Sequence, residues 1–190
     1  YLTYEADTRS EDEIKENFHD QARLLDPFID FFYFDVLSSV REFQLGIKAI
    51  ESFNKPYLIG AHISEGVKLP SGERISKIIS EIKHKNLLGI ILSCISPENF
   101  AENLDEVKSL SIPFGFKLNA FLTTKPTAGY TKTFNESKTG NPNEFLGLRK
   151  DLTPEKMLKF AKKFKEAGAT ILGGCCETRP HHIKEFCKLK

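Results

Sequence analysis

The sequence predicts an α/β fold built around a parallel β-sheet, and two observations carry this prediction. Short apolar runs of the kind that form buried strands alternate with stretches of helical period, and the pattern repeats about every 30 residues. Each connection between strands is therefore long enough to hold a helix, as parallel neighbouring strands require. The 190 residues suffice for one domain with a sizeable core.

The individual elements have local signals. Ser10 followed by Glu13 is a capping box, which predicts a helix that ends near Leu25. The helix predicted before the fifth strand has Pro154 in its first turn and Gly168 at its C-terminal cap. The expected strands span residues 29–34, 57–62, 88–92, 114–118 and 170–172, and the later helices span 39–53, 72–85, 97–110 and 154–167.

Residues 122–150 interrupt the alternation. They are rich in Thr, Lys, Gly, Asn and Pro and show little apolar periodicity. Loops of this length in compact domains are often lids or binding loops. Because this loop follows the fourth strand, we expect it to arch over the carboxyl ends of the strands. A surface insertion without a role at the site is the alternative.

The composition argues against several classes of protein. The net charge is +1, with 40% apolar and 28% charged residues, which speaks against nucleic acid or a membrane surface as an electrostatic partner. There is neither a run of about 18 apolar residues nor a signal-peptide pattern. Four cysteines without the pattern of a small secreted domain favour a reducing compartment, so we expect a cytoplasmic protein.

Two adjacent cysteines, Cys175 and Cys176, follow Gly173 and Gly174 where a buried strand should end. Successive strand residues face opposite sides, so both sulfurs reach one ion only if the backbone turns sharply. Glycine permits such a turn, and the pattern therefore favours a metal or thiol centre. The alternative is that both cysteines are small buried apolar residues. A strained vicinal disulfide is the weaker interpretation.

Cys94 ends a second apolar run of the same kind. The carboxyl ends of parallel strands lie on one face, so three thiolates can converge there although they are far apart in sequence. Thiolate is a soft ligand that suits zinc, and three protein ligands leave the fourth tetrahedral position open, as in catalytic zinc sites. We therefore predict a metal site made by Cys94, Cys175 and Cys176. Cys187 is expected to be buried filler.

Other polar residues also follow strand ends. Asp35, His62 and Asn119 each lie at or just past a predicted strand, which indicates a shared active-site face. Each has a structural alternative: Asp35 stays hydrated or caps the next helix, His62 is a buried residue bonded to a backbone carbonyl, and Asn119 caps a loop. His182 lies in the first turn of a helix after Pro180, and we expect it to be structural and to contact the cysteine loop.

These motifs resemble those of a known family. The double-cysteine segment and the residues after it resemble the zinc-binding signature of the homocysteine S-methyltransferases, and the segment around Cys94 resembles the family's other cysteine motif. The resemblance spans nearly the whole chain. It is carried by Gly173-Gly174-Cys175-Cys176 with Thr178, Pro180, His182 and Ile183, by Gly89, Cys94, Pro97 and Glu98, by Leu118-Asn119-Ala120, by Leu152-Thr153-Pro154-Glu155 and by the stretch from Asp30 to Glu42.

The resemblance implies a (β/α)8 TIM barrel, of which this chain would supply about strands four to eight. A complete barrel needs on the order of 250 residues. The chain opens at Tyr1 without a methionine, so we expect it to be part of a longer sequence. Residues 1–190 would then form a homocysteine-binding domain that lacks the first barrel strands.

The resemblance also implies a reaction. Zn²⁺ on Cys94, Cys175 and Cys176 would bind the thiolate of homocysteine as its fourth ligand, and the sulfur would take a methyl group to give methionine. The donor stays open among S-methylmethionine, a betaine-like ammonium compound and a folate-linked methyl group. Asp35, Asn119 and His62 would contact the substrate. Self-association into a homo-oligomer also stays open.

Three departures from the family pattern leave alternatives. Asp35-Val36 replaces a Glu-Thr pair, Glu177 replaces the glycine after the two cysteines, and Phe121 stands where glycine is common. One alternative is a zinc-binding barrel fragment without catalysis. The other is a thiol-redox protein that uses Cys175 and Cys176 with Cys94.

Overall fold

The computed structural model describes residues 9–82, 85–122 and 146–190, and these contain a five-stranded parallel sheet. The strands are β1 (Phe32–Leu37), β2 (Tyr57–His62), β3 (Leu87–Ile95), β4 (Phe114–Leu118) and β5 (Ile171–Gly174). They pair in sequential order, β1-β2-β3-β4-β5. A doubly wound sheet reverses its order at a switch point, whereas consecutive βα units of a barrel keep this order. The predicted α/β fold with a parallel sheet is confirmed.

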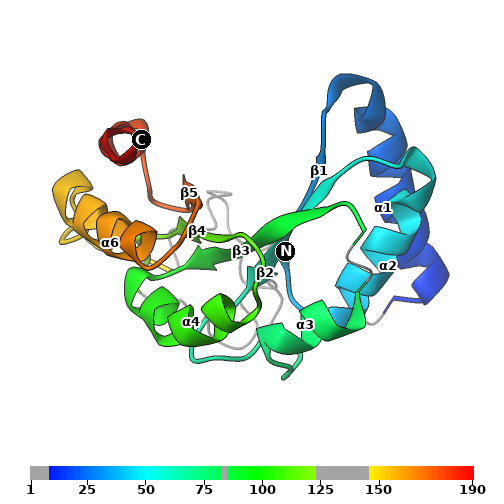
Figure 1. Cartoon of the computed structure of the whole chain (residues 1–190), viewed down its shortest axis with the longest axis horizontal. Helices are drawn as coiled ribbons and strands as arrows, with labels where there is room; N and C mark the ends of the chain where they lie inside the picture. Colours follow the sequence, from blue (N-terminus) through cyan, green and yellow to red (C-terminus); the bar gives the residue numbers. More distant parts are fainter. Residues whose placement is uncertain (1–8, 83–84, 123–145) are drawn as a thin grey trace, which may run out of the picture.

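The helices lie on the outer side of the curved row of strands (Figure 1). They are α1 (Glu11–Leu25), α2 (Val40–Ile50), α3 (Ile75–Glu81), α4 (Pro97–Ser109), α6 (Pro154–Glu166) and α7 (Pro180–Phe186), with short 3₁₀ turns η1 (Asp26–Phe28), η2 (Glu51–Phe53) and η4 (Cys187–Leu189). Ser10 and Glu13 form the predicted capping box at the start of α1. Every helix within the described ranges is too short or too polar to cross a bilayer.

Several predicted elements have different bounds in the structure. The strands β1 and β3 run three residues past their predicted ends, to Leu37 and Ile95. The first strand begins at Phe32, not at residue 29, because α1 is followed by the 3₁₀ turn η1 and the chain then bends at residues 30 and 31. The helix expected over 72–85 is shorter, since Gly72 has a φ of 98° and Ile82 is already extended. Local turn geometry at both ends therefore overrides the apolar periodicity of this segment.

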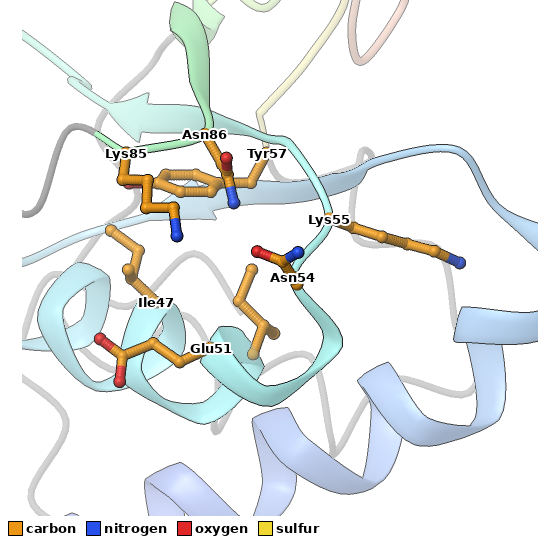
Figure 2. Close-up of a pocket in the computed structure, with 8 residues that line it drawn as sticks. Ile47, Glu51, Asn54, Lys55, Tyr57, Lys85 and Asn86 are labelled. Carbon is orange, nitrogen blue, oxygen red and sulfur yellow. The ribbon is translucent and has the colours of Figure 1, made fainter.

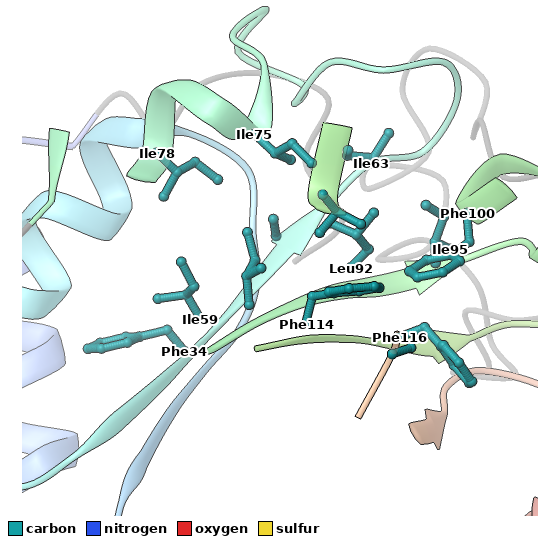
Figure 3. Packing of buried hydrophobic residues seen from close by; sticks show 14 of the residues in the cluster. Phe34, Ile59, Ile63, Ile75, Ile78, Leu92, Ile95, Phe100, Phe114 and Phe116 are labelled. Atoms are coloured by element: carbon teal, nitrogen blue, oxygen red, sulfur yellow. The ribbon is translucent and has the colours of Figure 1, made fainter. Parts of the chain in front are cut away.

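The apolar core lies between the sheet and the helices (Figure 3). Alternate strand residues such as Ile59 and Leu92 are fully buried on this side. Around Phe116, the ring of Phe100 packs edge-on with centroids 5.4 Å apart, and Phe164 lies 4.6 Å from Phe100. The intervening strand residues face the opposite, concave side of the sheet.

Two irregularities occur at the carboxyl ends of strands. The register shifts between Phe34 and Leu37 in β1 and between Ser93 and Ile95 in β3, as β-bulges do. The residues at the shifts, Val36 and Cys94, have positive φ values of 61° and 55°. A branched or bulky residue with positive φ is strained, and such strain concentrates at functional sites.

Candidate metal centre

The three predicted cysteines come together at the carboxyl edge of the sheet. The sulfur of Cys94 lies 3.7 Å from that of Cys176, and the sulfurs of Cys175 and Cys176 are 3.9 Å apart. All three sulfurs lie within 4.8 Å of one another, and all three cysteines are free. The spacing is too long for a disulfide bond and suits a shared ligand.

The bulge in β3 determines where Cys94 points. Strict alternation would send its side chain with Leu92 into the helix-side core. The register shift gives that place to Ile95, which packs in the main core, while Cys94 joins a second cluster with Phe121 and Leu146. The left-handed backbone at Cys94 thus turns its sulfur toward the other two cysteines.

Asn119 holds the bulge in place. Its side-chain nitrogen donates to the carbonyl oxygen of Cys94 at 2.6 Å and lies 3.8 Å from the Cys94 sulfur. Its side-chain oxygen accepts from the backbone N–H of Phe121. Asn119 is only 1% exposed. The contact that the structure gives Asn119 is therefore with a cysteine; its role as a substrate contact stays a prediction.

The turn that carries Cys175 and Cys176 differs from the expected one. Neither Gly173 nor Gly174 has a positive φ; the left-handed residue is Glu177, with a φ of 61°. The expectation that the glycines make the turn is therefore wrong. Gly174 is required for space, because a Cβ there would lie 2.3 Å from the hydroxyl oxygen of Thr178. That hydroxyl donates to the carbonyl oxygen of Cys175 and fixes the turn.

The three thiols are electrostatically coupled. Hydrogen bonding with the thiols of Cys176 and Cys94 lowers the pKa of Cys175, and the positive charge of Lys117 acts in the same direction. The hydrogen bond with Cys175 and burial raise the pKa of Cys94. One negative charge is thus favoured in the cluster, and it is shared among the sulfurs.

Asp35 lies on the concave side of the sheet and forms an ion pair with Lys117. Its carboxylate accepts a hydrogen bond from the ammonium of Lys117 at 2.5 Å. The same ammonium lies 5.4 Å from the centre of the Tyr33 ring. The Tyr33 hydroxyl in turn lies 2.6 Å from the Ser93 hydroxyl. Sequence reasoning missed Lys117, although its place two residues before Asn119 predicts the concave face.

His62, a predicted substrate contact, and His182, predicted to be structural, are both buried and hydrogen-bonded. His62 is 2% exposed; its Nε2 lies 2.8 Å from the Ser64 hydroxyl and its Nδ1 3.5 Å from the Ser93 carbonyl oxygen. Burial lowers the pKa of His62. His182 accepts from the backbone N–H of Arg179 in the cysteine loop and contacts the carbonyl oxygen of Leu152, as a structural residue does.

Cys187 differs from its prediction. It was expected to be buried, but it is exposed. α7 ends at Phe186 and the chain continues in the short turn η4, where Cys187 lies outside the core. Cys187 is therefore the one cysteine that stands apart from the three-sulfur cluster.

The body of the predicted loop, residues 123–145, lies outside the described residues. Its flanks meet beside the cysteines: Phe121 and Leu148 form an antiparallel bridge, and Leu146 belongs to the cluster of Cys94. Arg149 forms a two-pronged ion pair with Glu98 at 2.8 and 2.9 Å. Both flanks are thus anchored at the edge of the sheet that carries the site.

A hollow of about 270 Å³ lies at the other end of the strands, between α2 and the start of β2 (Figure 2). Its lining residues are Ile47, Ile50, Glu51, Asn54, Lys55, Tyr57, Lys85 and Asn86. None of the predicted site residues lines it. Active sites of parallel α/β sheets lie at the carboxyl ends of the strands, so this hollow is separate from the candidate centre.

Comparison with known proteins shows the family of this chain. The family model described as homocysteine S-methyltransferase matches residues 1–189. The chain belongs to the homocysteine S-methyltransferase family. Homocysteine S-methyltransferase 1 of Saccharomyces cerevisiae is 29% identical over 169 residues, which cover 83% of this chain and 47% of that protein. The Arabidopsis thaliana protein of the same name is 25% identical over 166 residues, covering 84% and 45%.

Solved structures agree with the fold. The metallated form of the homocysteine methyltransferase MmuM from Escherichia coli matches with a TM-score of 0.66 over 93% of this chain and 52% of that one. Its apo form matches with a TM-score of 0.70 over 100% and 61%. Sequence identity is 16% in both, so the likeness concerns the fold. The predicted partial barrel is confirmed, and the chain spans about half the length of its family relatives.

Proposed function

We propose that this chain carries the zinc-binding half of an enzyme that transfers a methyl group to the thiol of homocysteine and releases methionine. The observation that carries the proposal is the convergence of three cysteine sulfurs within 4.8 Å at the carboxyl edge of the sheet. Membership of the homocysteine S-methyltransferase family supports it. The domain over residues 1–190 would then supply the metal ligands of the whole protein.

The donor set fits zinc. Tetrahedral zinc with Zn–S bonds of about 2.3 Å needs sulfurs about 3.8 Å apart. Two of the three separations, 3.7 and 3.9 Å, match this requirement, and all three sulfurs lie within 4.8 Å of one another. When bound, zinc would supply an open fourth position in which the homocysteine sulfur stays ionised and nucleophilic.

The residues of this chain would prepare the site. Asn119 fixes the backbone of Cys94, and Thr178 fixes that of Cys175, so the sulfurs are held at their spacing before a ligand arrives. Phe121 and Leu146 cover Cys94 with apolar surface, which keeps water from that side of the cluster. Asp35, His62 and Asn119 stay proposed substrate contacts, and the methyl donor stays open among S-methylmethionine, a betaine-like compound and a folate-linked methyl group.

The decisive experiment measures bound zinc and methyl transfer together. Protein purified under reducing conditions is expected to hold about one zinc per chain, and Cys94→Ser is expected to lose most of it. Each class of donor is then tested with homocysteine, first on this chain and then on the longest available form of the protein. Cys187→Ser serves as the matched control, because Cys187 is exposed and stands apart from the cluster.

The alternatives predict different results. A zinc-binding fragment without catalysis retains the metal but transfers no methyl group in any form of the protein. A thiol-redox protein is metal-free and forms a reversible disulfide between Cys94 and Cys176 under mild oxidation. Folded wild-type protein that holds no zinc would refute the proposed function.

A further inference from the structure

An ion pair crosses the concave face of the sheet just below the cysteines. Lys117 is on β4 and Asp35 on β1, so the pair spans β2 and β3. Their side chains are 22% and 40% exposed. Ion pairs of this exposure add little stability, because water screens them and two flexible side chains must be ordered. Stability alone therefore gives no reason for a lysine on this face.

The local structure makes room for the pair. Gly60 on β2 lies beneath it, where a Cβ would come 2.7 Å from the hydroxyl oxygens of both Tyr33 and Ser93. On β5, Gly173 pairs with Lys117, and a Cβ there would lie 3.3 Å from Lys117 Cγ. Glycines on both sides thus leave the lysine stem free to reach across the sheet.

The position relates the pair to the metal centre. Gly173 is the register partner of Lys117, and Cys175 follows two residues later on the same side of the chain. Two residues of a strand span about 7 Å. Lys117 is therefore attached about two residues from the cysteines, on the strand next to the one that carries them.

The pair has unused hydrogen-bonding capacity. A lysine ammonium has three donors, and among the described residues only Asp35 accepts from Lys117. Only one oxygen of Asp35, Oδ2, takes part in this bond, and the Tyr33 hydroxyl also interacts with the Asp35 carboxylate. The ammonium of Lys117 and the carboxylate of Asp35 lie side by side and are partly exposed. They are complementary to a zwitterion whose carboxylate faces the ammonium and whose ammonium faces the carboxylate.

We propose that Lys117 binds the carboxylate of the amino-acid thiol and stays paired with Asp35. The contact of Asp35 with the ammonium of that thiol belongs to the proposed function. The inference rests on the proposed function, because it assumes that the thiol end reaches the three cysteines. Lys117 is then the residue that selects α-amino-acid thiols over simple thiols. Tyr33 is a positioning residue that holds the ammonium of Lys117 over its ring.

Binding of four thiols to the cobalt(II)-loaded protein tests the assignment. Binding is followed by the increase in sulfur-to-cobalt charge-transfer absorption that an added thiol causes over that of the three cysteines, and this measurement needs no methyl donor. Homocysteine has both charges, 4-mercaptobutyrate has only the carboxylate, 3-mercaptopropylamine has only the ammonium, and 1-propanethiol has neither. The variants are Lys117→Met, Lys117→Arg and Asp35→Asn, with Lys162→Met as the matched control on the exposed face of α6.

Lys117→Met is expected to lower the affinity for homocysteine and 4-mercaptobutyrate at least about tenfold. The affinity for the other two thiols should change by no more than about twofold. Asp35→Asn is expected to lower the affinity for homocysteine and 3-mercaptopropylamine instead. Lys117→Arg keeps the charge and should recover most of the loss, which separates lost recognition from lost folding.

Equal weakening of all four thiols in Lys117→Met, or no weakening, would overturn the assignment while leaving thiol binding at the metal intact. A charge-transfer absorption of the wild type that no thiol changes would instead overturn the proposed function, and this inference with it. The two failures are therefore distinguishable.

Discussion

A single left-handed residue, Glu177, ends the turn that presents two adjacent cysteines. A non-glycine residue in this conformation costs roughly 1–2 kcal/mol. The side chain of Glu177 has a partner in Arg179, at 3.0 Å, which both Glu177→Gly and Glu177→Ala remove. We therefore expect Glu177→Gly to be more stable than Glu177→Ala by about 1 kcal/mol in urea unfolding.

The control for this prediction is Glu102, an exposed residue within α4. There the order should reverse, with glycine about 0.5–1 kcal/mol less stable than alanine. Equal stability of the two Glu177 variants would show that the backbone at this position is not strained.

The titration of a single residue, His62, makes the unfolding free energy depend on pH. Burial lowers its pKa in the folded state, whereas the unfolded chain has an ordinary histidine pKa of about 6.5. Below that pH the unfolded state binds a proton that the folded state does not, so stability is present above about pH 6.5 and falls with falling pH. His62→Gln should flatten the change in unfolding free energy between about pH 6.5 and 5. An unchanged slope would contradict a buried neutral His62.

At the level of elements, the bulge of β3 depends on its contact with the end of β4. Asn119→Ala removes the hydrogen bond to the Cys94 carbonyl oxygen and frees the bulge. Mutation of a residue that hydrogen-bonds to a metal ligand typically lowers metal affinity by about 10–100-fold. We expect Asn119→Ala to lower zinc affinity by this amount, measured in competition with a chromophoric zinc chelator.

Asn103→Ala is the matched control for the bulge. Asn103 is also fully buried and donates to the backbone carbonyl oxygens of Gly66 and Asn99 at 2.8 Å, within another part of the fold. It should lower the unfolding free energy without changing zinc affinity. Equal losses of zinc affinity in the two variants would mean that general destabilisation, not the bulge, accounts for the effect.

At the level of the whole molecule, zinc would tie β3 to the turn after β5 across β4. A ligand that binds only the folded state stabilises it by about 2.7 kcal/mol at a hundredfold excess over its Kd. Removing zinc with a chelator should therefore lower the melting temperature of the wild type. Cys94→Ser should abolish this zinc-dependent increment, whereas Cys187→Ser should keep it. An equal melting temperature of the wild type with and without zinc would argue against metal bridging of the sheet.

The order of strands and helices could be predicted because each element has a local signal. The period of its apolar residues, its capping serines and threonines, and the prolines in its first turn lie within a few residues of one another. The predicted bounds of elements differ from the observed bounds where turn geometry decides them, as at η1 and Gly72.

The residue pattern was enough to predict the parallel sheet, and also the three cysteines whose sulfurs come together at its carboxyl edge. These follow from periodicity and from the rule that carboxyl ends of parallel strands share one face. Only the tertiary structure decided that a bulge turns Cys94 into the site, that Glu177 makes the turn and that Lys117 pairs with Asp35. The physical reason is that these features depend on register and on contacts across several strands, which no local pattern of residues encodes.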